Sequence, residues 1–207
     1  MNTEDTICAV CTGVGGAISI IRIAGPDSII VARKVWRGRE YPGADTARKM
    51  ILGHIVDPDS SGDGDPALSV CMPGPNSYTG DDVVELHCHG GAMAAKRVLQ
   101  GVIKAGARSA EPGEFTFRAF VNGKMDLTQA EAVCDIITAH SDMALHLAER
   151  QIDGALGSKI RSLREQLTEV LSEIESRLDF PEEELDWVPG PELCESVENV
   201  ILEIAEL

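Results

Sequence analysis

The 207-residue sequence lacks any apolar run long enough to cross a membrane, and it lacks a secretory signal at its start. A membrane-spanning helix needs about 20 consecutive apolar residues, and the uncharged apolar runs here are far shorter. The first ten residues, MNTEDTICAV, have no basic segment ahead of a long apolar stretch. We therefore expect a soluble, cytoplasmic protein that has no membrane partner and is large enough to bury its own core.

Basic residues are scarce in the second part of the chain. Residues 1–124 contain 13 Lys and Arg against 14 Asp and Glu, a net charge of −1. Residues 125–207 contain 5 against 20, a net charge of −15, and no Lys or Arg follows Pro181. A segment of this charge repels a phosphate backbone. The imbalance therefore argues against nucleic-acid binding by the second part on its own.

Two motifs that would signal a metal or a nucleotide are incomplete. Cys8 and Cys11 form a C-x-x-C, but no second pair exists and nothing completes a four-ligand zinc set. We interpret the six cysteines as reduced thiols and predict no metal. The glycine-rich turn at Gly13–Gly16 has no following Lys-Ser/Thr and precedes an apparent strand, whereas a P-loop precedes a helix. We interpret it as a hairpin turn.

The hydrophobic pattern up to residue 124 predicts a mixed α+β domain. Short apolar or alternating runs predict strands at residues 6–11, 17–23, 49–56, 67–72 and 82–88. Helices are predicted from Gly25-Pro26-Asp27 to about Trp36 and over residues 92–105. We expect a polar loop at 57–66 and a charged, aromatic-bearing loop at 111–127.

From Asp126 onward the pattern becomes purely helical. Capping signals occur at residues 126–129 (DLTQ) and at Ser141. Apolar residues recur every three or four positions from Leu145 to Leu178, which predicts one helix of about 37 residues that Pro181 stops. A further amphipathic helix is predicted from Leu193. The sequence therefore predicts two domains, 1–124 and 125–207.

Three polar features of the first domain are candidates for function. Arg22 interrupts an apolar strand, where it would either pair with a carboxylate or hold an anionic ligand. Glu85, His87 and His89 share one face of an alternating strand, either as a solvated edge or as a ligand-binding face. Lys124 lies in a turn and alone would be an ordinary surface lysine. The residues suggest a small anionic ligand held by Arg22, Lys124 and a carboxylate.

Three segments make the sequence recognisable: PNSYTGDDVVELHCHGG (75–91), EPGEFTFRAFVNGKMDLTQAEAV (111–133) and LDFPEEE (178–184). They closely resemble the MnmE/TrmE family of tRNA-modification GTPases, and the resemblance runs from Asp5 to about Asp186. It implies a dimerising N-terminal domain similar to the tetrahydrofolate-binding domain of glycine-cleavage T-protein. It also implies a helical domain into which a Ras-like GTPase domain is inserted.

The resemblance implies both a reaction and partners. With the flavoprotein MnmG, the family installs a carboxymethylaminomethyl-type group at carbon 5 of the wobble uridine of certain tRNAs, and folate supplies the one-carbon unit. We therefore expect a homodimer through the N-terminal domain, an MnmG-type partner, and tRNA bound by the complex rather than by this chain alone.

The resemblance also assigns site residues. Contacts to 5-formyl- or methylene-tetrahydrofolate are implied for Arg22, Glu85 and Lys124, and the pocket wall for His89, Gly90 and Gly91. No catalytic residue is assigned. Two departures concern the Gly13–Gly16 loop, which is one residue shorter than in the family and lacks its prolines, and Phe117, which stands where the family has Lys.

The family's GTPase motifs and its C-terminal cysteine tail do not occur in these 207 residues. GTP, potassium and magnesium are therefore expected only in the full-length family, and we expect an incomplete helical domain and no GTP hydrolysis here. Two alternatives remain open. One is a structural or interaction module with an unused folate pocket, which the apolar stripe at 145–178 motivates. The other is a folate-dependent one-carbon transferase.

Overall fold

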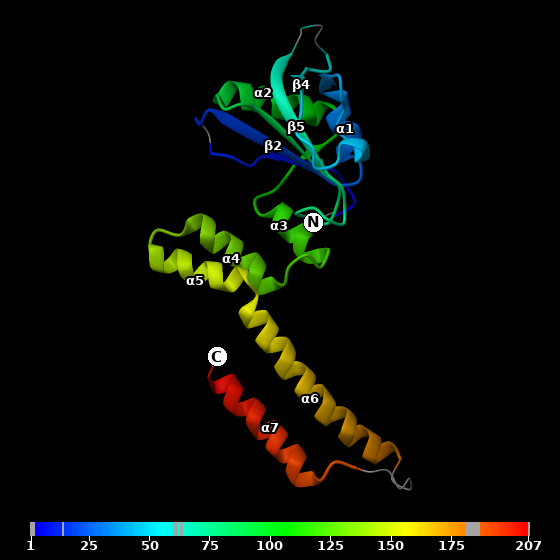
Figure 1. The fold of residues 1–207 in the computed structure, drawn as a ribbon, viewed down its shortest axis with the longest axis vertical. Helices are drawn as coiled ribbons and strands as arrows, with labels where there is room; N and C mark the ends of the chain where they lie inside the picture. The colour runs from blue at the N-terminus through cyan, green and yellow to red at the C-terminus, as the bar shows by residue number, and fades with distance from the viewer. Residues whose placement is uncertain (1–2, 14, 60–61, 63, 181–186, 207) are drawn as a thin grey trace. The chain divides into compact units, whose positions relative to one another are not determined.

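The computed structural model describes residues 3–13, 15–59, 62, 64–180 and 187–206. The chain divides into two compact units, Met1–Ala130 and Glu131–Leu207. The first unit contains a seven-stranded sheet with helices, and the described part of the second unit consists of helices and their connections (Figure 1). The predicted α+β class is confirmed.

The sheet has the strand order β3-β4-β5-β6-β2-β1-β7. Neighbouring strands are antiparallel, except that β7 runs parallel to β1. The strands are β1 (Ile7–Val10), β2 (Ile18–Ala24), β3 (Trp36–Gly38), β4 (Ile51–Ile55), β5 (Asp65–Met72), β6 (Val83–His89) and β7 (Arg108–Ser109). All five predicted strands are present. The short strands β3 and β7 were not predicted, and β5 begins inside the segment expected to be a loop.

One face of the sheet is covered by α1 (Ser28–Lys34) and α2 (Ala92–Lys104), which enclose the main core. The alternation of β2 and β6 places every second residue on this face. The buried side chains of this core come from the sheet and the two helices, and include Ile21, Ile23, Leu86, Val31 and Val102. The sheet and these two helices therefore form one layered core.

Within the described residues of the first unit, the opposite face of the sheet is covered at one end. There Ile7, Ala24 and Val83 form a small second core with Phe115 of α3 (Glu114–Val121). Beyond that end, Ile18 and Leu52 remain 59% and 72% exposed. We call this sheet face, opposite α1 and α2, the open face. A short 3-10 turn, η1 (Ala44–Thr46), precedes β4.

Helix α3 corrects the expectation of a loop over residues 111–127. The helix begins after Gly113, whose φ of 76° is in the left-handed region that glycine adopts most readily. It is held by Glu114 and Arg118, which are 0% and 1% exposed. Both side chains are held by residues outside the helix, Glu114 by Arg108 and Arg118 by Asp5. Because these contacts are tertiary, the local sequence, with its Pro, Gly and aromatic residues, showed no helical pattern.

The second unit contains the end of α4 (Leu127–Thr138), then α5 (Asp142–Ile152), α6 (Ala155–Asp179) and α7 (Gly190–Ala205). Both predicted caps are present: Asp126 Oδ1 accepts from the Gln129 N–H at 3.0 Å, and Ser141 Oγ accepts from the Ala144 N–H at 3.2 Å. The reciprocal bond of a capping box also forms, because Gln129 Oε1 accepts from the Asp126 N–H at 2.9 Å.

The prediction of a single helix of about 37 residues was wrong, because the helical segment is interrupted between α5 and α6. Gly154 has a φ of 76°, which ends α5 and starts α6 in a new direction. Helix α6 ends at Asp179, and Pro181 lies outside the described residues. Helices α6 and α7 lie side by side and are linked by an ion pair between Lys159 and Glu203 (Figure 1).

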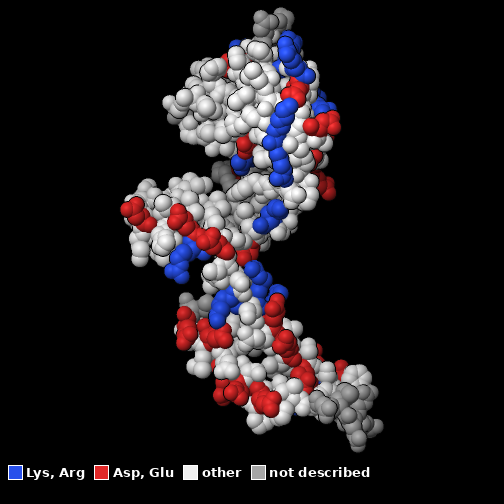
Figure 2. Space-filling model, in the orientation of Figure 1, with Lys and Arg blue, Asp and Glu red and all other residues white. Residues whose placement is uncertain are grey.

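Charge in the second unit is concentrated on these helices. Figure 2 shows acidic side chains gathered along α6 and α7, whereas the visible basic side chains of this unit lie beside α5 and near the start of α6. In the described part of the second unit, much of the negative charge thus lies on exposed helical surface. Among the described segments, no helix is both long enough and apolar enough to cross a membrane.

Candidate functional site

Arg22 and Glu85 meet on the open face. They lie directly opposite each other in the β2–β6 ladder, where side chains of paired residues point to the same side. Arg22 Nε donates to Glu85 Oε1 at 2.9 Å, and Arg22 Nη2 lies 2.9 Å from the same oxygen. Their side chains are 24% and 14% exposed. Both nitrogens converge on Oε1, so Glu85 Oε2 is outside this pairing.

Two aromatic rings lie over the Arg22 guanidinium. Its central carbon is 5.1 Å from the centroid of Tyr78 and 5.6 Å from that of Phe115. A cation within about 6 Å of a ring centroid is attracted to the ring face. The Tyr78 hydroxyl is also 2.9 Å from Thr116 Oγ1, which ties the loop after β5 to α3. The sequence contained both aromatics within the recognised segments, but their position over Arg22 depends on α3.

Lys124 lies on the same loop system but not on the ion pair. Its backbone N–H donates to the Ala119 carbonyl at 2.8 Å, and its side chain passes beside Gly80, two residues after Tyr78. Nearby, the Asn122 amide donates to the Thr79 carbonyl at 2.8 Å. Within the described residues, Lys124 makes no hydrogen bond or ion pair with Arg22 or Glu85. The residue is exposed, and its Cγ lies beside the loop that carries Tyr78.

His87 is the nearest polar neighbour of the unused Glu85 oxygen. Its Nε2 lies 3.5 Å from Glu85 Oε2, and the side chain is 18% exposed. This nitrogen is buried and has no hydrogen-bond partner among the described residues. On either side, the residues directly opposite His87 are apolar, Ile20 on β2 and Leu68 on β5. The alternation of the sequence correctly placed His87 on the same face as Glu85, but it could not show that His87 Nε2 lacks a hydrogen-bond partner among the described residues.

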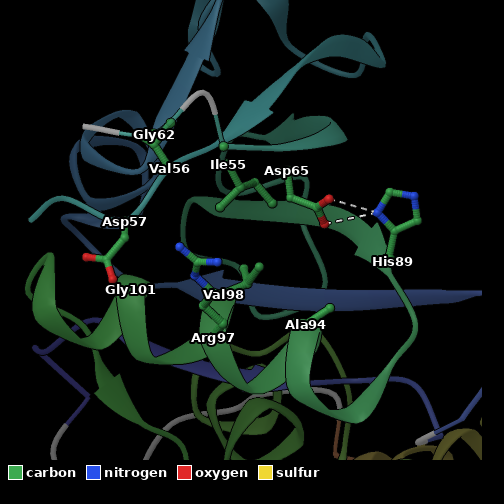
Figure 3. Close-up of a pocket in the computed structure, with 11 residues that line it drawn as sticks. Ile55, Val56, Asp57, Gly62, Asp65, His89, Ala94, Arg97, Val98 and Gly101 are labelled. Atoms are coloured by element: carbon green, nitrogen blue, oxygen red, sulfur yellow. Dashed lines mark hydrogen bonds and ion pairs between the residues drawn. The ribbon is translucent and has the colours of Figure 1, made fainter. Parts of the chain in front are cut away.

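His89 occupies a different place. Its Nδ1 lies 3.0 Å from both carboxylate oxygens of Asp65, and the pair borders a cavity of about 430 Å³ between α2 and the β4–β5 hairpin. Figure 3 shows Arg97 of α2 pointing into this cavity between Asp57 and Asp65. Arg22, Glu85 and Lys124 do not line it. The assignment of His89 to a folate pocket therefore stays a prediction.

Gly90 has a structural role at the end of β6. A Cβ atom at this position would lie 2.0 Å from the Gly16 carbonyl oxygen, so the two backbone segments are in close contact. At Gly91 a Cβ atom would meet nothing within 4 Å. The two glycines therefore differ, because only Gly90 is required by the packing of the β1–β2 turn. The assignment of Gly90 and Gly91 to the wall of a folate pocket also stays a prediction.

The C-x-x-C of the first strand does not form a paired site. Cys8 is fully buried in the main core, and burial raises the pKa of its thiol to about 12. Cys11 follows the strand and is exposed. The described residues contain no group of three or more His, Cys, Asp or Glu placed to hold a metal ion.

Comparison with known families assigns both parts of the chain. Residues 6–124 match the family described as GTP-binding protein TrmE N-terminus, and residues 127–207 match the MnmE helical domain. The chain therefore has the α+β domain and the helical domain of a class of GTP-binding proteins. It belongs to the MnmE/TrmE family, which confirms the resemblance seen in the sequence.

Several curated relatives are named tRNA modification GTPase MnmE. The protein of Latilactobacillus sakei is 43% identical over 204 residues, covering 98% of this chain and 44% of the relative. That of Symbiobacterium thermophilum is 48% identical over 187 residues, covering 88% and 40%. That of Clostridioides difficile is 40% identical over 210 residues, covering 100% and 45%. The chain thus spans less than half the length of these relatives.

Proposed function

We propose that residues 1–124 form a tetrahydrofolate-binding, dimerising domain of a tRNA wobble-uridine modification protein, and that residues 125–207 form part of its helical domain. The ligand is 5-formyl- or methylene-tetrahydrofolate, bound through Arg22, Glu85 and Lys124. The observation that carries the proposal is the Arg22–Glu85 pair on the open face beneath Tyr78 and Phe115.

The donor set of this site suits a folate. A pterin presents parallel N–H groups, for which a carboxylate is a two-oxygen acceptor. Glu85 Oε2 lies outside the bonds that Arg22 makes. The glutamate tail of folate is anionic, which suits the cations of Arg22 and Lys124. Tyr78 and Phe115 supply the aromatic surface on which a flat heterocycle packs.

The open face also supports dimerisation. Ile18, Leu52 and Leu68 are 59%, 72% and 38% exposed on it, and Leu52 lies directly opposite Leu68 in the β4–β5 ladder. Exposed apolar groups that gather on one face mark contact surfaces. We assign this face to a second copy of the chain, whose association would also bury the edge of the ligand site.

The proposal extends to the whole protein of which these domains are part. When bound, folate supplies the one-carbon unit for carbon 5 of the uridine, in a complex with an MnmG-type flavoprotein in the cytoplasm. The six cysteines are all described and all unpaired, as in a reducing compartment. Because the exposed helices are acidic, we propose that tRNA is held by the complex rather than by this segment.

Calorimetry with 5-formyl-tetrahydrofolate tests the ligand claim. The chain should bind, and Arg22→Ala should weaken binding about 10- to 100-fold because a charge-assisted contact is lost. The matched control is Arg37→Ala, an exposed arginine of the same sheet on β3, which should bind as the parent does. A folded dimer that ignores the folate would refute the claim.

One alternative keeps support from the structure. On α6, the residues Leu167, Leu171, Ile174 and Leu178 are 41–73% exposed, which also suits an interaction module whose folate pocket is unused. Sedimentation with and without 5-formyl-tetrahydrofolate separates the two functions. A dimer that folate stabilises favours the folate-binding domain, and a dimer insensitive to folate favours the interaction module.

A further inference from the structure

The two oxygens of the Glu85 carboxylate have different surroundings. Oε1 receives both nitrogens of Arg22 at 2.9 Å. Oε2 has no part in that pairing and faces His87 Nε2 across 3.5 Å. This separation is longer than a hydrogen bond, and the imidazole nitrogen is buried and unsatisfied among the described residues. The imidazole of His87 therefore lies beside the one Glu85 oxygen that Arg22 leaves open.

We propose that His87 is a positioning residue that controls, through its charge, whether Glu85 Oε2 is free to accept a ligand N–H. This inference rests on the proposed folate function and adds a regulator to the same site. When His87 is neutral and carries its proton on Nδ1, Nε2 offers a lone pair and no donor, which fits its lack of a hydrogen-bond partner among the described residues, and Oε2 is available to the ligand. When His87 is protonated, its Nε2–H closes the short gap and donates to Oε2, so that the proton and the ligand compete for one oxygen.

Among the residues around His87, Glu85 is the one placed to accept a hydrogen bond from its Nε2. The residues directly opposite it, Ile20 and Leu68, carry no charge and accept no hydrogen bond through their side chains. The charged and titratable groups of the neighbouring elements are Glu85 and His89 on β6, Arg22 on β2, Asp65 on β5, Cys11 after β1, His54 on β4 and Tyr78 in the loop above.

Most of these groups are already engaged, including Tyr78, whose hydroxyl contacts Thr116. Asp65 is paired with His89, and Arg22 is a cation held on the other Glu85 oxygen. The nearest acceptor for a proton on His87 Nε2 is therefore Glu85 Oε2. A carboxylate that accepts from both cations presents neither oxygen freely to an incoming donor.

The expected effect follows from one competing proton. Histidine is the side chain whose charge commonly changes between about pH 5 and pH 8, so measurements at about pH 5.5 and pH 8 bracket that change. If only the neutral form binds well, the affinity falls by up to tenfold for each pH unit below the titration midpoint. Over this interval we expect 5-formyl-tetrahydrofolate to bind about tenfold more weakly at the lower pH.

Calorimetry at these two pH values tests the inference. The parent chain should lose about tenfold in affinity at about pH 5.5. His87→Gln, which keeps a polar side chain that does not titrate, should bind equally at both. His87→Leu, which matches the apolar flanks, serves as the second variant if the amide disturbs folding. The control His54→Gln removes an exposed histidine of β4 and should keep the parent's loss.

The outcomes separate this inference from the proposed function. A parent whose affinity does not change with pH, or His87 variants that keep the full pH dependence, would overturn the role of His87 while leaving folate binding intact. A parent chain that does not bind at about pH 8 overturns the proposed function, and the role of His87 falls with it.

Discussion

Replacement of Glu114 by Gln should destabilise the first unit strongly. Glu114 is fully buried, and its two oxygens accept from Arg108 at 2.7 and 3.0 Å and from the Glu111 N–H at 2.8 Å. Arg118, 1% exposed, lies 3.3 Å away and also bonds to Asp5 at 2.6 Å. The variant keeps the side-chain shape but removes the charge that both arginines surround.

The magnitude follows from the ionisation of Glu114. Hydrogen bonds from Arg108 are the main cause that lowers the pKa of this carboxyl from 4.5 to about 2. Each pKa unit corresponds to about 1.4 kcal/mol, so the ionised form stabilises the fold by about 3 kcal/mol. Because the folded-state pKa is depressed, this contribution is complete above pH 4.5 and is lost as the pH falls toward about 2.

Urea unfolding at neutral pH measures the effect. Trp36 lies in the core of the first unit and is 2% exposed, whereas Trp187 belongs to the second unit. In a Trp187→Phe background, tryptophan fluorescence therefore reports on the first unit. The matched control is Glu40→Gln, which breaks an exposed ion pair with Lys49 and should cost at most about 1 kcal/mol.

Two results would refute this reasoning. One is a loss for Glu114→Gln no larger than that for Glu40→Gln. The other is a difference between parent and Glu114→Gln that persists unchanged as the pH falls from 4.5 toward about 2, where the charge should already be lost.

Two further pairs of substitutions test local structure. Gly90→Ala should cost about 2 kcal/mol or more, because the added methyl meets the Gly16 backbone at 2.0 Å, while Gly91→Ala should be tolerated. Thermal unfolding of the two variants compares them, and equal losses would contradict the close contact. Asp126→Ala should cost about 1 kcal/mol by removing the cap of α4, and Asp126→Asn should restore most of it. Urea titrations followed by circular dichroism decide this, and an Asn variant as unstable as the Ala variant would speak against capping.

Elements with a clear period could be predicted from the sequence. The alternation of β6 correctly put Glu85 and His87 on one face and Leu86 in the core. The capping box at Asp126 was equally local, since its bonds join residues three apart. These features depend on neighbours in the chain, which a pattern can represent.

Features that depend on distant contacts could not be predicted. The ion pair between Arg22 and Glu85 joins residues 63 positions apart. The sequence therefore identified both residues as candidates but could not predict that they contact each other. Helix α3 depends on a carboxylate held by Arg108, outside the helix. The helix interruption at Gly154 results from the positive φ of that one residue. A glycine within a helical pattern only weakens the prediction of a helix and does not show where the helix ends. The domain boundary predicted at residue 124 stays a prediction.

The most direct test of the central claim is to locate the ligand on the folded chain. Amide chemical-shift changes during titration with 5-formyl-tetrahydrofolate would do so. We predict changes at Arg22, Tyr78, Glu85 and Phe115 on the open face. Changes confined to the α2 cavity lined by Ala94, Arg97 and Gly101, or no changes at all, would contradict the account.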